Sequence, residues 1–147
     1  ILINVVSIVG LSLLLAAAFG TVASTLLAMI AFALLRALSG GIHLSHSAAC
    51  IAVSTALFVI IPHFPLGELW CIILTALSIG LVVMFAPSRI EQQSRMPTSA
   101  YPMLKLASAL LVALNFWLLS DVLALSFFIQ SLLLLRKLAS KEHLLKP

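Results

Sequence analysis

A histidine and a cysteine stand close together in the first third of the chain. His43 follows two glycines, Gly40 and Gly41, and Cys50 comes seven residues after the histidine. An imidazole can take the proton of a thiol and leave the reactive thiolate, which is the chemistry of a cysteine nucleophile and its general base. Ionisable groups at the end of a long apolar segment are costly and usually mark a site. These residues therefore raise the hypothesis of a catalytic pair, Cys50 and His43.

The spacing of this pair demands a break in the helix. Residues seven apart in one straight helix share a face but lie about 10 Å apart along the axis. A general base must approach its nucleophile to about 3 Å, so one continuous helix through residues 36–50 excludes the pair. Gly40 and Gly41 supply the break, because glycine adopts backbone conformations that other residues avoid and often ends helices.

We therefore expect a second helix to begin shortly before Cys50. Ser45 or Ser47 is a suitable N-cap, since a hydroxyl accepts hydrogen bonds from the free N–H groups of the first turn. His43 then lies in the connecting loop and can fold back toward Cys50. The positive end of the helix dipole and a neighbouring imidazolium both favour a thiolate there.

Other interpretations of these residues stay open. A free cysteine such as Cys50 is often a small buried hydrophobe, and a histidine in a loop is often only solvated. His46 is a rival base, because it precedes Cys50 by four residues and would share its helical face. His43, His46 and Cys50 could also supply three zinc ligands, but no carboxylate is near in sequence, and we expect no metal site.

Arg36 and Cys71 also carry reactive or charged groups. Arg36 precedes Gly40 by four residues. It is either an anchor at the membrane interface or a group that binds a substrate carboxylate. Cys71 lies in another apolar segment, and we interpret it as a packing residue.

The composition is that of an integral membrane protein. The chain has 147 residues, of which 63% are hydrophobic and 8% charged, and its mean hydropathy is +1.28. Soluble domains carry about 25% charged residues. No alternating strand pattern is present, so helices are expected. Two cysteines make no disulfide framework. The chain begins with Ile1, so we expect that a preceding segment is missing or was removed.

The apolar segments predict an all-α polytopic membrane protein with about six transmembrane helices in a single domain, residues 1–147. Residues 1–35 carry no charge and are too long for one span, so a turn at Gly20 and Thr21 is expected. Prolines and polar residues separate the later segments. The predicted helices are 2–19, 22–38, 47–61, 66–85, 103–119 and 122–138.

The charged residues lie asymmetrically about these six helices. The basic residues all fall on one side of an alternating arrangement: Arg36, Arg89, Arg95, Lys105, Arg136, Lys137, Lys141 and Lys146. Two acidic residues, Glu68 and Asp121, fall in loops on the other side. By the positive-inside rule the basic side, and with it the glycine and histidine segment, faces the cytoplasm.

The combination of Arg36, Gly40, Gly41, His43 and Cys50 resembles the signature of the accessory gene regulator B (AgrB) family. These proteins are membrane-embedded cysteine peptidases of Gram-positive quorum sensing, so the resemblance implies a location in the bacterial cell membrane. It further implies cleavage of an AgrD-type propeptide. Cys50 would form a thioester acyl-enzyme with His43 as general base. The acyl group would then pass to a cysteine or serine of the peptide and close a thiolactone or lactone ring.

The resemblance also assigns the remaining site residues. Arg36, Gly40 and Gly41 match family positions linked to activity. A basic face suits an acidic propeptide region, so Arg89, Arg95 and Lys105 are candidate docking residues. The topology of the chain is an alternative explanation of these charges. The family usually carries an amphipathic segment before its first span. This chain starts directly in apolar sequence, so we expect that this segment is absent or truncated. No third catalytic residue is evident and no cofactor is expected, so a Cys-His dyad is the expected machinery.

Two further function classes remain as alternatives. A small transporter or channel subunit would use His43, His46 and Cys50 as its polar site and Gly40 with Gly41 as a helix break. A transporter should carry polar residues near mid-membrane on several helices. This chain has few besides Asn115 and Gln130, which weakens this interpretation. A purely structural membrane subunit is the third. We expect contact with the lipid bilayer and no nucleic-acid partner, and leave a homodimer open.

Overall fold

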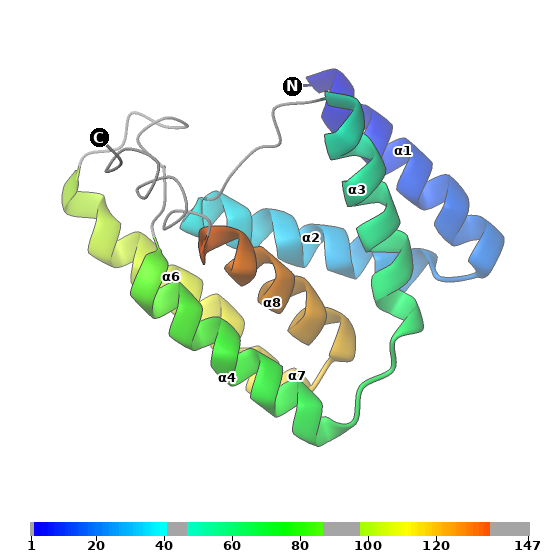
Figure 1. Cartoon of the computed structure of the whole chain (residues 1–147). Helices are drawn as coiled ribbons and strands as arrows, with labels where there is room; N and C mark the ends of the chain where they lie inside the picture. The colour runs from blue at the N-terminus through cyan, green and yellow to red at the C-terminus, as the bar shows by residue number, and fades with distance from the viewer. Residues whose placement is uncertain (1, 41–46, 87–97, 136–147) are drawn as a thin grey trace, which may run out of the picture.

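The computed structural model describes residues 2–40, 47–86 and 98–135, which fold almost entirely into helices (Figure 1). This confirms the all-α class. The helices are α1 (Leu2–Phe19), α2 (Val22–Ser39), α3 (Ser47–Ile60), α4 (Glu68–Phe85), α6 (Tyr101–Ala113), α7 (Asn115–Leu118) and α8 (Asp121–Leu135). Two short 3-10 turns, η1 (Ile61–His63) and η2 (Thr98–Ala100), follow α3 and precede α6.

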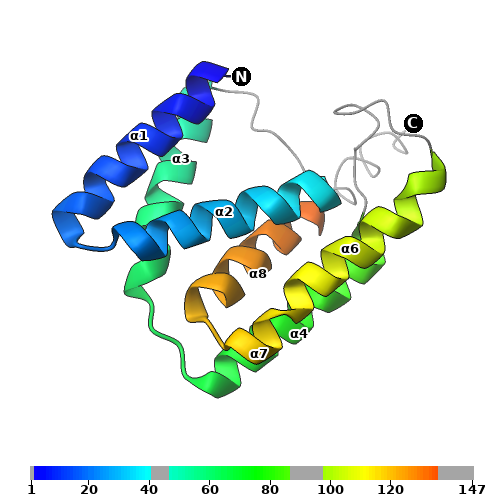
Figure 2. The same ribbon diagram turned by 180° about the vertical axis from the view of Figure 1, so that it is seen from behind.

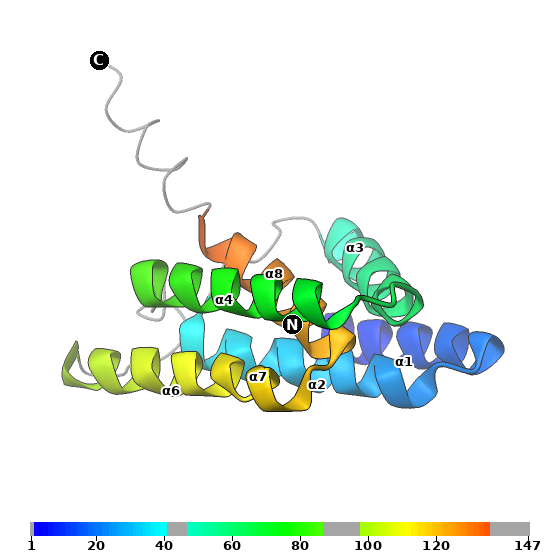
Figure 3. The same ribbon diagram turned by 90° about the horizontal axis from the view of Figure 1, so that it is seen from below.

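The helices form two layers. Figure 3 shows α4, α8 and α3 in one layer and α6, α7, α2 and α1 in the other. Seen from behind, the second layer lies in front of the first (Figure 2). Helix α8 packs most extensively against α4 and α2, while α1 packs mainly against α3. Most of the α8 side chains are buried, so this short helix is the centre of the bundle.

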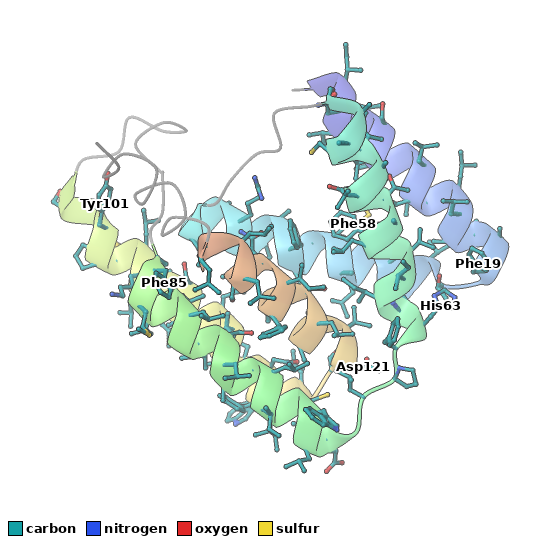
Figure 4. All side chains as sticks on the ribbon, in the orientation of Figure 1. Phe19, Phe58, His63, Phe85, Tyr101 and Asp121 are labelled. Carbon is teal, nitrogen blue, oxygen red and sulfur yellow. The ribbon has the colours of Figure 1, made fainter. Side chains whose placement is uncertain are left out.

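The helix ends alternate between two ends of the bundle, as a chain that repeatedly crosses a layer must. In Figure 4, Phe85 and Tyr101 mark one end, and Phe19, His63 and Asp121 mark the other. Helix α2 ends and α6 begins on the Phe85 side (Figure 1). Arg36 and Lys105 belong to those helix ends, whereas Asp121 begins α8 on the opposite side. Within the described residues the charges are thus separated as the sequence predicted.

Most of the predicted boundaries are confirmed, and the turn between α1 and α2 shows why. Gly20 has a φ of 71°, a conformation that favours glycine. The N–H of Thr21 donates to Ala16 O at 2.9 Å and that of Gly20 to Ala17 O at 3.3 Å. This is the Schellman pattern, which satisfies the last carbonyls of α1.

Two predicted helices need correction. The fourth begins at Glu68 instead of residue 66, with Gly67 as its N-cap in an extended conformation. The fifth begins two residues earlier than predicted, at Tyr101, and ends at Leu118; α6 and α7 join through Leu114, whose backbone is also helical. For the sixth helix, α8 runs to Leu135, and residues 136–138 lie outside the described part.

Asn115 explains the sharp turn from α7 into α8. Its Nδ2 donates to Thr75 Oγ1 on α4 at 2.9 Å and to Ser120 O at 3.2 Å, and its Oδ1 accepts from Ser120 N at 3.1 Å. Leu119 adopts the left-handed conformation, with φ 45°. That conformation costs a branched residue free energy, which the fully buried amide network offsets.

The helices are suited to a lipid environment. Three described helical stretches are long and apolar enough to cross a membrane: Val22–Ser39, Glu68–Phe85 and Tyr101–Leu118. Three shorter apolar helices accompany them. Many large apolar side chains point outward, including Trp117 at 92% exposure and Trp70 at 58%. Exposed tryptophans near helix ends are typical of the membrane interface.

Candidate active site

The backbone breaks after α2, at the first of the two glycines. Gly40 has φ 77° and ψ −151°, and its N–H donates to Arg36 O at 2.9 Å. A positive φ favours glycine, so Gly40 ends the helix for the predicted reason. Helix α3 begins separately at Ser47. The continuous helix through residues 36–50 that would exclude the catalytic pair is therefore absent.

Cys50 lies in the first turn of α3, as expected. It is a free cysteine and half-buried. The N-cap prediction for Ser47 is wrong, since Ser47 is the first helical residue and its hydroxyl donates to Asn4 Oδ1 on α1. Ser45 lies outside the described residues. The bond to Asn4 ties the start of α3 to α1 and so helps to fix the position of Cys50.

Cys50 opens onto an apolar groove of about 670 Å³ between four helices. Its walls come from α1, α2, α3 and α8, whose arrangement is seen in Figure 1. Arg36 on α2 lines the same groove as Cys50. Ser54 is the other polar lining residue. The structure thus brings a thiol and a guanidinium together at an otherwise apolar surface.

The family model for accessory gene regulator B matches residues 1–135. The chain belongs to this family. The AgrB family is known for processing autoinducer propeptides in quorum sensing. The match includes every helix that lines the groove. No match was found among curated proteins or among solved structures.

Gln130 is a residue near the AgrB groove that site reasoning from sequence missed. It is fully buried on α8, and its Nε2 donates to Gly40 O at 2.9 Å. Among the described residues its Oε1 has no hydrogen-bond partner. A lone amide in an apolar helix was the available signal. The sequence could not indicate that Gln130 bonds to Gly40, since the two residues are 90 positions apart.

Several predicted AgrB site residues lie outside the described ranges: Gly41, His43, His46, Arg89 and Arg95. The pairing of His43 with Cys50 therefore stays a prediction. Lys105 is half-buried on α6. No group of three potential metal-ligating side chains occurs among residues 2–40, 47–86 and 98–135.

Cys71 differs from Cys50 in its surroundings. It is 1% exposed on α4 and does not line the groove. Its charged neighbours are Asp121 and Glu68, the acidic residues placed opposite the basic side. Buried among helices with carboxylates nearby, it lacks the cationic surroundings that activate a thiol.

Proposed function

We propose that this AgrB-family protein is a membrane cysteine endopeptidase that cleaves an AgrD-type propeptide. Cys50 is the nucleophile and His43 its general base. The observation that carries the proposal is the position of Cys50 beside Arg36 in one groove, just beyond the helix break at Gly40. A helix N-terminus and a nearby cation are the surroundings that favour a thiolate.

The proposed reaction has two steps. In the first, His43 takes the Cys50 proton, the Sγ–C bond forms at the scissile carbonyl, and the peptide C–N bond breaks as the leaving amine receives that proton. In the second, a thiol or hydroxyl of the peptide attacks the thioester carbonyl. The ring C–S or C–O bond forms, the Cys50 Sγ–C bond breaks, and the proton of the attacking group returns through His43 to Cys50.

Backbone N–H groups at the start of α3 are candidates for stabilising the oxyanion. The first N–H groups of a helix have no partner within the helix and carry its positive dipole end. Cys50 is the fourth residue of α3, so its own turn supplies such donors beside the thiol. Oxyanion stabilisation by preorganised N–H groups is worth about 3 kcal/mol per donor in acyl-transfer enzymes.

The groove supplies the binding site for the peptide. Its lining is apolar apart from Arg36, Cys50 and Ser54. Apolar side chains next to the scissile bond would bury themselves there, gaining about 25 cal/mol for each Å² removed from water. The groove lies near the bundle end with Arg36, which we place toward the cytoplasm, where Arg89, Arg95 and Lys105 would attract an acidic propeptide region.

A transport function gains no support from the two polar residues that favoured it. Asn115 is engaged by Thr75 and Ser120 at the α7–α8 turn. Gln130 is fully buried and donates to Gly40 O. Neither lines the groove.

The test uses protein reconstituted in liposomes with the propeptide encoded beside it. Mass spectrometry should detect both the cleaved product and a covalent acyl adduct on Cys50. Cys50→Ala should abolish cleavage, whereas Cys71→Ala, the matched control at the other cysteine, should retain it. Cleavage by Cys50→Ala would reject the proposed function.

A further inference from the structure

We propose that Gln130 is a positioning residue, whose hydrogen bond to Gly40 holds the last turn of α2 so that Arg36 faces Cys50 across the groove. This inference rests on the proposed function of Cys50. Gln130 acts through the backbone of α2 and need not touch the substrate.

The hydrogen bond joins the central helix to the exact point where α2 ends. Gln130 Nε2 donates to Gly40 O at 2.9 Å, and both residues are buried. Gly40 has left the helical conformation, so its carbonyl has no place in the α2 ladder. A buried carbonyl needs a donor: Ser39 Oγ lies 3.5 Å from Gly40 O, and α8 provides the shorter bond from 90 residues away.

The last turn of α2 is itself one hydrogen-bonded unit. Gly40 N donates to Arg36 O at 2.9 Å, and Ser39 Oγ donates to Leu35 O at 2.7 Å. A bond that fixes the position of Gly40 therefore also fixes the backbone of Arg36. On the other side of the groove, Cys50 belongs to α3, which packs mainly on α1 and only slightly on α2. The position of Arg36 relative to Cys50 thus depends on what fixes the end of α2.

Packing between α2 and α8 does not require an amide at residue 130. Leu35 of α2 and Leu134 of α8 are buried in the same apolar cluster. A methionine at position 130 would fill similar space without a buried polar atom. The glutamine instead leaves its Oε1 without a partner among the described residues, which costs free energy. The amide therefore has the bond to Gly40 O as its one stabilising polar contact, and we assign that bond the positioning of the turn.

The test compares Gln130→Met and Gln130→Leu with the wild type. Methionine keeps the length but cannot donate, and leucine can neither donate nor accept a hydrogen bond. Gln130→Met removes the unpaired Oε1 together with the bond to Gly40 O, which keeps Ser39 Oγ at 3.5 Å, so its thermal stability should change little. Ser126→Ala is the control, because Ser126 is also buried on α8 but bonds only within it, to Val122 O.

The main readout is the iodoacetamide alkylation rate of Cys50 against pH, followed by mass spectrometry of the Cys50 peptide. We expect both Gln130 variants to react about three- to tenfold more slowly at pH 7, because Arg36 no longer faces Cys50 across the groove. The kcat of propeptide cleavage should fall about tenfold, with little change in KM. Ser126→Ala should match the wild type in both.

The outcomes separate this inference from the proposed function, since alkylation needs no propeptide. A wild-type alkylation profile in the folded fraction of both variants overturns the inference, even if their thermal stability falls. Slower alkylation of Cys50 with unchanged thermal stability supports it. Cleavage by Cys50→Ala rejects the proposed function, and with it the premise of the inference.

Discussion

Arg36 and Cys50 line the same apolar groove from different helices. Arg36 is in the last turn of α2, and Cys50 is in the first turn of α3. The helix break at Gly40 therefore separates the two residues along the backbone, while the fold brings them to one surface. In an apolar groove a charge is weakly screened, so this relationship should govern the reactivity of Cys50.

Replacing Arg36 should slow the reaction of Cys50 with iodoacetamide. We expect Arg36→Ala to lower the alkylation rate at pH 7 by about three- to tenfold, and Arg36→Lys to lower it less, because a cation stabilises the thiolate. Time-resolved mass spectrometry of the Cys50 peptide measures the rate. Equal rates in Arg36→Ala and the wild type would show that the guanidinium does not act on the thiol.

The two histidines of the segment after Gly40 should differ in function. His43→Ala should reduce propeptide cleavage by at least about 100-fold, as loss of a general base does. His46→Ala should change cleavage by less than about threefold, since a merely solvated residue contributes little to the reaction. Cleavage kinetics with folded, monodisperse protein in liposomes measures both. The reverse order would make His46 the base.

Filling the groove should weaken propeptide binding without disabling the thiol. Ala33 lines the groove on α2, and Ala37, one turn later, is exposed and does not line it. Ala33→Phe should raise KM by about tenfold, the effect of losing about 1.4 kcal/mol of binding. Ala37→Phe is the matched control and should leave KM unchanged. The same KM in both variants would place the peptide elsewhere.

The amide of Asn115 should stabilise the fold, with no direct part in the reaction. Asn115→Leu keeps the branching at Cγ but removes the hydrogen bond to Thr75 and those that hold the Leu119 turn. We expect a loss of about 1–3 kcal/mol, measured by denaturant titration in detergent. A double-mutant cycle with Thr75→Val should give about 0.6 kcal/mol for the single interhelical bond. A coupling energy of zero would show that the Asn115–Thr75 hydrogen bond between α7 and α4 does not stabilise the fold.

The side of the membrane that each loop faces can be tested by cysteine labelling. A cysteine at Gln93 should react with a membrane-impermeant maleimide only from the cytoplasmic side, because the loop is rich in basic residues. A cysteine at Gly67, exposed before α4, should react only from the outside. Cys50→Ala with Cys71→Ala provides the background. Labelling of position 93 from outside would invert the proposed orientation.

The sequence by itself determined the helical class, most helix boundaries, the break at Gly40 and the separation of charges. These features depend on local properties: the length of apolar segments, the conformational freedom of glycine and the placement of basic residues. They need no knowledge of which helices are neighbours. For the same reason the sequence could place Cys50 in a first helical turn and interpret Cys71 as packing.

Only the tertiary structure decided how these parts meet. The groove has walls from α1, α2, α3 and α8, and no segment of the chain contains it. The bond from Gln130 to Gly40 and the bond from Asn115 to Thr75 span 90 and 40 residues. Apolar helices in a membrane give little indication of their neighbours, because lipid and protein are similarly apolar and the pairing depends on packing and on a few polar contacts. Local pattern therefore predicted the nucleophile, and the fold supplied its surroundings.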